Sequence, residues 1–484
     1  VLENGIKLLT KKVLTSTSQP ELAVIEGVSE LLNENNIKAS EITMIIHGTT
    51  LATNAIIERK GAKTCFITTS GFRDVLDIGY ESRFDQYDIL IDKTMSLVPR
   101  KYRYVINERT DVNGSIITPI EKSQFKNLAT KIKSEKFESV AVGFLHSYAN
   151  SENETILKNF LINELPDVEV SVSSDVCPEI REYERFTTTV VNAYIKPLMS
   201  NYLKKLDQKL LNSGFNCSML LMTSGGTLTN ISSACNNPVR LVESGPAGGA
   251  ILATSIAKDM DLSKVISFDM GGTTAKITII EDQKANKARE FEVDRKARFK
   301  KGSGFPLRIP VIEMVEIGAG GGSIARVNKL DQIITGPDSA GSFPGPACYS
   351  NGGELPTVTD ADLVIGKINP DNFAGGKIKL SKRLANEAIT KNIGKLVNID
   401  TDIAALAISE IVDETMSNAA RVHTVEQGHE TSNRTLIAFG GAAPLHIARV
   451  AEKLRVSSVI IPTNASVGSA VGFLKAPVGY EVVK

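Results

Sequence analysis

The turn at residues 271–274 has the residue types and spacing that suit chemistry on phosphate. It lies within Ser267-Phe-Asp-Met-Gly-Gly-Thr-Thr-Ala-Lys-Ile-Thr-Ile-Ile280. Gly271 and Gly272 tolerate positive φ and carry no Cβ, so a ligand can approach the backbone closely. In a tight turn, successive N–H groups and the hydroxyls of Thr273 and Thr274 point at one place, and a phosphate is the natural occupant.

Asp269 stands just before this turn and would repel a phosphate directly. Its expected role is therefore to hold Mg²⁺, or the water shell of the ion, beside the phosphates. Apolar and β-branched residues at 264–267 and the alternation at 275–280 predict a strand on each side of the turn. An ordinary glycine hairpin remains the alternative interpretation.

Three more glycine-dense turns are candidates for the same nucleotide-binding site. We expect all four turns to meet in one cleft, because each offers few donors and a triphosphate needs several sets. The glycines concerned are Gly225 and Gly226, Gly320 and Gly321, and Gly440 and Gly441.

His47 and Glu316 are the further candidates for catalysis. His47 ends a predicted strand over Ile42–Ile46 and is followed by three threonines, although a lone histidine is more often a core residue. Glu316 opens a glycine-dense turn. For Glu316 and for Asp360, loop capping and catalysis are both open.

Two other patterns invite a reactive interpretation that we do not favour. Cys348 lies in Gly-Pro-Ala-Cys-Tyr, a small apolar setting that favours a packed thiol over a nucleophile. His423, Glu426 and His429 form H-x-x-E-x-x-H, but on a helix the two histidines lie on different faces. An ion pair is therefore favoured over a metal site.

Composition excludes some classes of protein. The 484 residues include 55 basic and 55 acidic side chains, and this zero net charge argues against a general nucleic-acid binder. No apolar run is long enough to span a membrane. The five cysteines are odd in number and show no CxxC pair, so we expect reduced thiols and a cytoplasmic location without a secretory leader.

The elements that must position these residues alternate between strand and helix, which predicts an α/β fold with a mainly parallel sheet. Asn4-Gly5 predicts a hairpin within residues 1–15. Pro20 opens a predicted helix to Glu34, and another helix is expected from 119 to 135. We place a boundary near 175–180, before a long helix that ends near Leu211.

Many short motifs occur in one order along the chain: HGTTLATNA, SGGT, ESGPAGGA, FDMGGTTAK, EIGAGGGSIA, PGPACY, TVTDADL and FGGAAPLH. This series resembles the hydantoinase A / oxoprolinase family, which includes large subunits of acetone and acetophenone carboxylases and of caprolactamase. The resemblance implies a hydantoinase/oxoprolinase N-terminal region at 1–175. It also implies an actin-like (ribonuclease H-like) ATPase region at 185–484, with mixed sheets flanked by helices around a nucleotide cleft. Gly440 and Gly441 would then pass close to the adenosine.

The resemblance also implies an activity. Members use ATP and Mg²⁺ to activate a cyclic amide or a ketone, so we expect an ATP-dependent hydrolase that opens a hydantoin, oxoproline or lactam after phosphorylation of the amide oxygen. Two alternatives stay open: a subunit of a ketone carboxylase, and a non-catalytic nucleotide switch with the same architecture. A hydantoinase B-like partner subunit and an oligomeric state are implied as well.

The chain departs from the family pattern at its ends. Members begin with a first phosphate loop of the form Asp-x-Gly-Gly-Thr-Phe-Thr-Asp, which nothing here matches, and they continue past the equivalent of Lys484. We therefore expect the sequence to be trimmed at both ends, and to bind ATP weakly without the first loop and the partner.

Overall fold

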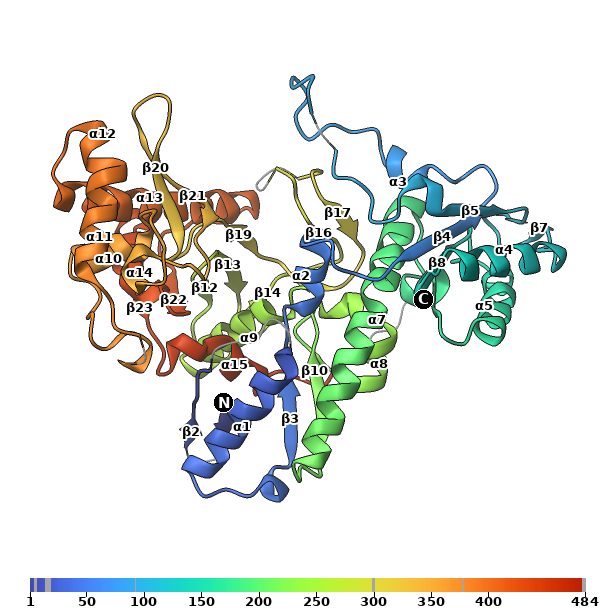
Figure 1. The fold of residues 1–484 in the computed structure, drawn as a ribbon, viewed down its shortest axis with the longest axis horizontal. Coiled ribbons are helices and arrows are strands. Elements are labelled where there is room, and N and C mark those ends of the chain that lie inside the picture. Colours follow the sequence, from blue (N-terminus) through green and yellow to red (C-terminus); the bar gives the residue numbers. More distant parts are fainter. Residues whose placement is uncertain (4–6, 14–18, 92, 298–300, 377, 481–484) are drawn as a thin grey trace. The chain divides into compact units, whose positions relative to one another are not determined.

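The computed structural model describes residues 1–3, 7–13, 19–91, 93–297, 301–376 and 378–480 (Figure 1). The chain forms two compact units. We call the first the hairpin unit (Val1, Gly248–Asn286 and Ile312–Lys475) and the second the N-terminal unit (Leu2–Ala247, Lys287–Val311 and Ala476–Lys484). The two units are defined by how compactly their residues pack. The division of the chain at 175–185 comes from the family resemblance, and it stays a prediction.

The N-terminal unit contains a parallel sheet in which the strands follow the order β5, β4, β8, β9. Alternate side chains serve its two faces, as the period of a strand requires. Cys65, Ile67 and Val140 pack with helices α4 and α5, while Phe66 and Ala141 pack against α7. The expected parallel α/β arrangement is therefore present here. The elements are β4 (Thr64–Thr69), β5 (Arg103–Ile106), β8 (Ser139–Gly143), β9 (Glu169–Val172), α4 (Ser123–Ser134), α5 (Glu152–Glu164) and α7 (Glu182–Asn212).

A second, smaller sheet of this unit joins β3 in parallel to β10, which pairs antiparallel with β11. Leucines and tyrosines of α7 cover it together with α1 and α2. Its elements and the remaining ones of the unit are β1 (Leu2–Glu3), β2 (Leu8–Leu9), β3 (Met44–His47), β6 (Arg109–Thr110), β7 (Ile116–Thr118), β10 (Ser218–Met222), β11 (Leu228–Asn230), β15 (Lys287–Ala288), β16 (Phe291–Val293), β17 (Phe305–Leu307), α1 (Pro20–Glu34), α2 (Leu51–Ile57), α3 (Val75–Ile78), α6 (Ser173–Val176) and α8 (Ile231–Asn236).

The hairpin unit is built on a mixed sheet with the order β14, β13, β12, β22, β23, in which β19 also pairs with β13. Strands β12 and β13 form the glycine hairpin, and β22 lies parallel to β12. The elements are β12 (Lys264–Met270), β13 (Ala275–Glu281), β14 (Lys284–Ala285), β19 (Val315–Ile317), β20 (Ser323–Val327), β21 (Ile333–Ser339), β22 (Thr435–Phe439), β23 (Ser458–Ile460), α9 (Ser244–Asp259), α10 (Val358–Val364), α11 (Lys382–Ile389), α12 (Lys395–Val397), α13 (Thr401–Glu426), α14 (Ala443–Leu454) and α15 (Gly468–Phe473); the pair β15 and β18 (Val311–Ile312) stands apart.

Helices cover both faces of this mixed sheet, which gives the unit three layers (Figure 1). Ile266, Phe268 and Leu436 face α13 and α14 in one core cluster. Val265 and Phe439 face α9 in another. Mixed sheets flanked by helices are the fold class expected from the sequence, and the expectation is confirmed.

Most predicted elements are present, with shifted ends. Helix α1 runs over the expected Pro20–Glu34, and its proline stands at the helix start, where the missing N–H costs nothing. The helix expected from residue 119 begins at Ser123 instead, and before it the N–H of Ile120 donates to Asn153 Oδ1 (3.3 Å). Strands β1 and β2 pair as expected, while the Asn4-Gly5 turn lies outside the described residues. Among the helices that the structure describes, none has the length and apolar composition to cross a bilayer.

Candidate functional site

The glycine hairpin closes at the predicted turn. Met270 pairs with Ala275, and the N–H of Gly271 donates to the carbonyl of Thr274 (3.0 Å). A Cβ built on Gly272 would meet no atom within 4 Å. Gly272 and Thr273 are exposed, so the outer side of the turn is open to a ligand.

The loop at residues 318–322 lies directly on this turn. Gly321 and Gly322 donate their N–H groups to the carbonyls of Gly271 (3.1 Å) and Gly272 (2.6 Å). A Cβ on Gly320 would lie 2.6 Å from the carbonyl carbon of Thr273, so only glycine permits this contact. The N–H and hydroxyl of Thr359 both donate to the carbonyl of Gly321 (2.7 Å each), which fixes the loop from the other side.

The loop at residues 440–442 reaches the same hairpin. Gly440 has φ +93°, and a Cβ there would lie 2.4 Å from the carbonyl oxygen of Met270 and 2.6 Å from Asp269 Oδ1. The N–H of Ala442 donates to the carbonyl of Met270 (3.0 Å). Three of the four predicted glycine turns therefore converge within the hairpin unit.

Asp269 lies at the end of β12, on the sheet face that α9 and α15 cover. Ser469 Oγ of α15 donates to Asp269 Oδ2 (3.1 Å). Burial raises the pKa of Asp269, although this hydrogen bond and the charge of Lys276 lower it. Ser469 and Thr359 were missed by the sequence analysis, since neither stands in a pattern that marks it.

Glu316 lies in strand β19 rather than in the glycine-dense turn that follows. Register places it opposite Lys276, which itself stands opposite Asp269. Lys276 Nζ lies 3.7 Å from Glu316 Oε1, and the Glu316 side chain is 45% exposed. An acid, a base and an acid therefore form one row across three strands.

The predicted turn at Gly225 and Gly226 belongs to the N-terminal unit. It closes the β10–β11 hairpin, where Gly226 takes φ +75°. Ser224 Oγ donates to the carbonyl of Pro310 (2.7 Å), and a Cβ on Gly225 would lie 3.3 Å from Pro310 Cβ. The end of strand β3 lies alongside, since His47 pairs with Leu221.

His47 is held by a tyrosine. Its Nε2 lies 2.9 Å from the hydroxyl of Tyr202 on α7. Burial lowers the pKa of His47 to about 4, so the ring is neutral at physiological pH. This geometry suits the core interpretation, and a catalytic role for His47 stays an untested prediction.

Asp360 and Cys348 are buried next to each other. Asp360 is fully buried and closes a capping box with Thr357 at the start of α10, and it also accepts the N–H of Cys348 (2.7 Å). Burial, followed by the nearby charge of Asp360, raises the pKa of the Cys348 thiol. Of the two roles left open for Asp360, the geometry favours capping.

The H-x-x-E-x-x-H pattern forms no metal site in the structure. His429 Nδ1 lies 3.4 Å from Glu281 Oε1, which belongs to the hairpin. Across the described ranges, no group of three or more His, Cys, Asp and Glu side chains is arranged to hold a metal ion.

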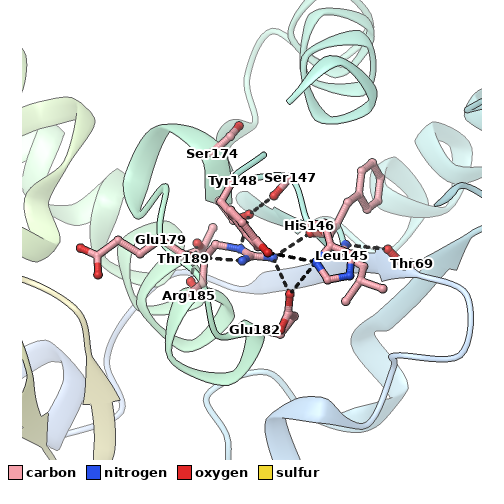
Figure 2. Close-up of polar contacts among 12 residues, drawn as sticks. Thr69, Leu145, His146, Ser147, Tyr148, Ser174, Glu179, Glu182, Arg185 and Thr189 are labelled. Carbon is pink, nitrogen blue, oxygen red and sulfur yellow. Dashed lines mark hydrogen bonds and ion pairs between the residues drawn. The ribbon is translucent and has the colours of Figure 1, made fainter. Parts of the chain in front are cut away.

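A polar cluster joins the ends of β4 and β8 to the start of α7 (Figure 2). The buried guanidinium of Arg185 donates to the carbonyls of Phe144 and Glu179 (2.9 Å each) and to Glu182 Oε1 (3.3 Å). His146 Nδ1 lies 3.9 Å from the same carboxylate oxygen. The cluster therefore fixes the first turn of α7 against the parallel sheet.

Comparison with protein families decides the relationship. A model of the family described as "Hydantoinase/oxoprolinase" matches residues 185–482, and one of the "Hydantoinase/oxoprolinase N-terminal region" matches residues 1–165. The chain belongs to the hydantoinase/oxoprolinase family. The resemblance seen in the sequence is thereby confirmed.

Individual relatives agree with this assignment. An uncharacterized protein of Methanocaldococcus jannaschii is 40% identical over 471 residues, which cover 96% of this chain and 68% of that protein. Caprolactamase subunit alpha of Pseudomonas jessenii is 32% identical over 466 residues, which cover 95% of this chain and 66% of the subunit.

Solved structures show the same fold. The crystal structure of ATP-dependent caprolactamase from Pseudomonas jessenii has a TM-score of 0.84 at 30% identity, covering 99% of this chain and 69% of that chain. The nucleotide-free structure of acetone carboxylase has a TM-score of 0.82 at 25% identity, covering 95% and 66%. The chain thus spans about two thirds of the length of these relatives.

Proposed function

We propose that this member of the family is an ATP-dependent hydrolase that opens a cyclic amide, namely a hydantoin, oxoproline or lactam. The observation that carries the proposal is the convergence of the 318–322 and 440–442 loops on the glycine hairpin beside Asp269. The ATP-dependent caprolactamase similar in sequence and fold supports the choice of a cyclic amide.

The turn fits a phosphate group. The open space beside Gly272 leaves room for it, and Gly272, Thr273 and Thr274 would supply N–H and hydroxyl donors. Gly320, Gly321 and Gly440 act by allowing close packing of the loops, and Gly441 is exposed beside them. Gly225 and Gly226 belong to the N-terminal unit, and a role of their own in nucleotide binding stays a prediction.

Asp269 fits a magnesium ion held mainly by phosphate and water. Mg²⁺ in nucleotide sites commonly uses one or two carboxylates rather than a cage of protein ligands. The described residues offer no such cage, whereas Asp269 is a carboxylate beside the turn. Burial raises the pKa of Asp269 despite the charge of Lys276, and a neighbouring cation would relieve this cost.

ATP, when bound, would supply a phosphoryl group to the amide oxygen with release of ADP, and the loss of amide resonance would open the carbon to attack by water. The chain's own residues would position the phosphates and shield the reacting group. A general base is still required, and Glu316 is our proposed candidate because it is exposed and lies in the row with Lys276 and Asp269.

A ketone carboxylase subunit is the second candidate function. The acetone carboxylase structure favours it, because its fold matches nearly the whole chain. A nucleotide switch is the third, and it differs in turning over ATP without any organic substrate. A partner subunit resembling hydantoinase B and a cytoplasmic location are also proposed, the former supported by the relative that is an alpha subunit.

One product assay separates these functions. The chain, alone and with a B-type subunit, is incubated with ATP and Mg²⁺ and with oxoproline, hydantoin, caprolactam or acetone, each with and without bicarbonate. Substrate-dependent ADP release with a ring-opened product supports the hydrolase. A bicarbonate-dependent carboxylated product supports the carboxylase, and ATP turnover that ignores every substrate rejects both.

A further inference from the structure

A buried histidine outside the glycine loops connects three helices of the hairpin unit. His446 Nδ1 lies 2.7 Å from Asp413 Oδ1, and Nε2 lies 3.0 Å from Asp362 Oδ2. The second contact is an ion pair in which the N–H is not aligned with the oxygen. All three side chains are at most 2% exposed.

Two of these residues lie on helices that anchor the loops, and the third lies on a helix that packs against both. His446 lies in the first turn of α14, which begins at Ala443 immediately after the 440–442 loop. Asp362 lies on α10, three residues after Thr359, whose N–H and hydroxyl hold Gly321. Asp413 lies on α13, which packs against both α10 and α14.

Charge makes the arrangement rigid. Two buried carboxylates face the ring, Asp362 from α10 and Asp413 from α13, and Lys367 Nζ lies 3.6 Å from Asp362 Oδ1. Burial opposes a charge on the ring, but the close contacts with Asp362 and Asp413 and the charges of these two carboxylates outweigh it and raise the pKa of His446 to about 9. A buried ion pair that loses one partner leaves an uncompensated charge, so the three groups stay together.

We propose that His446 is a positioning residue for nucleotide binding, because it joins the anchors of the 318–322 and 440–442 loops to α13 and so fixes both loops around the glycine hairpin. This inference rests on the proposed function for its effect on ATP. Its structural content, the coupling of two loops through one ring, is measurable without ATP.

The test compares variants of the full chain by amide hydrogen exchange and by calorimetric titration with ATP and Mg²⁺. In His446→Gln, the amides of residues 318–322 and 440–442 should exchange at least about tenfold faster. ATP affinity should fall about 10- to 100-fold, since small displacements of a binding loop have effects of this size.

Asp362→Asn gives a sharper version of the test. It removes the contact to α10 and leaves the His446–Asp413 pair intact. Exchange should then accelerate in the 318–322 loop and not in the 440–442 loop. In this variant the opposite charges of His446 and Asp413 still compensate each other, so no unpaired buried charge is created at the ring. Asp362→Asn therefore supplies the measurement if His446→Gln does not fold.

Two matched controls share helix α14. Arg449→Gln removes an exposed ion pair with Glu410 that links α14 to α13. It should change amide exchange in neither loop. Val450→Ala opens a gap in the buried core, and it should lower the melting temperature without selective exchange in the loops.

Unchanged exchange in both loops of His446→Gln would overturn the inference. So would an equal acceleration in Val450→Ala, because general destabilisation would then explain the effect. Faster loop exchange in a protein that shows no ATP binding before mutation, even with a first phosphate loop restored and a B-type subunit present, would uphold the coupling and reject the proposed function instead.

Discussion

The two units each gather glycine-rich turns at the ends of parallel strands, and they do so by different physical means. In the hairpin unit, backbone packs on backbone, and a Cβ on Gly320 or Gly440 would come within 2.4–2.7 Å of backbone atoms. In the N-terminal unit, hydroxyls hold the turns: Ser224 bonds Pro310, and Thr53 Oγ1 accepts the N–H of Glu243. In the hairpin unit, glycine is therefore required because a side chain would collide with the neighbouring backbone. In the N-terminal unit, side-chain hydroxyl groups hold the turns, and close backbone packing does not demand glycine.

A buried histidine in each unit also differs from its counterpart, here in charge. His446 is charged because two carboxylates face it, whereas burial keeps His47 neutral beside a tyrosine hydroxyl. Residue type thus fails to predict charge, and the neighbours supplied by the fold decide it.

The largest expected effect concerns Asp269, the carboxylate beside the turn of the glycine hairpin. Asp269→Asn should abolish Mg²⁺-dependent ATP turnover. The melting temperature should stay near that of the wild type, since burial already disfavours the charge that is removed. ATPase assays and thermal melting, run together, check this. Asp282→Asn, an exposed residue just after the same hairpin, is the matched control, and undiminished turnover in Asp269→Asn would contradict the assigned role.

Alanine at the two kinds of glycine tests the comparison directly. Gly320→Ala should lower the free energy of unfolding by about 1–3 kcal/mol and weaken ATP binding, because the added carbon displaces the hairpin backbone. Gly225→Ala meets Pro310 at 3.3 Å and should lower it by less than about 1 kcal/mol. Chemical denaturation of both variants provides the measurement. Equal losses in the free energy of unfolding would contradict the proposed difference between the two glycine clusters.

Stability should depend on pH through the two histidines, in opposite directions. The pKa of His446 is raised to about 9, so its contribution is complete below about pH 6.5 and is lost as the pH rises through 9. The pKa of His47 is lowered to about 4, so its contribution is present above about pH 6.5 and is lost as the pH falls towards 4. Melting temperatures between pH 4 and 10 should form a plateau between these limits. Asp413→Asn removes one of the charges that raise the pKa of His446, so the loss of melting temperature at alkaline pH should begin at a lower pH. The loss at acid pH, which depends on His47, should not change.

Cys348→Ser should have the smallest effect. The thiol is buried, its pKa is raised, and Asp360 beside it can accept a hydrogen bond from a serine hydroxyl as well. Most of the activity should remain, with a stability change of about 1 kcal/mol. A loss of several orders of magnitude in kcat with unchanged folding would instead make this thiol a nucleophile.

The sequence alone determined the local features. Proline at a helix start and an apolar stripe specify α1, and two β-branched runs around Gly271-Gly272 specify the hairpin. The order of the motifs was sufficient to identify the family. Each of these signals comes from residues near one another in the chain, whose backbone preferences and periodicity need no distant partner.

Only the tertiary structure decided which distant residues meet. Ser469 reaches Asp269 across 200 positions, and His446 meets Asp362 and Asp413 although no spacing marks the three as a set. Glu316 was expected in a turn, but it lies in strand β19, whose backbone pairing with β13 places it opposite Lys276. Charge, burial and hydrogen bonding at such positions depend on how strands and helices pack, and one sequence does not contain that arrangement in local form.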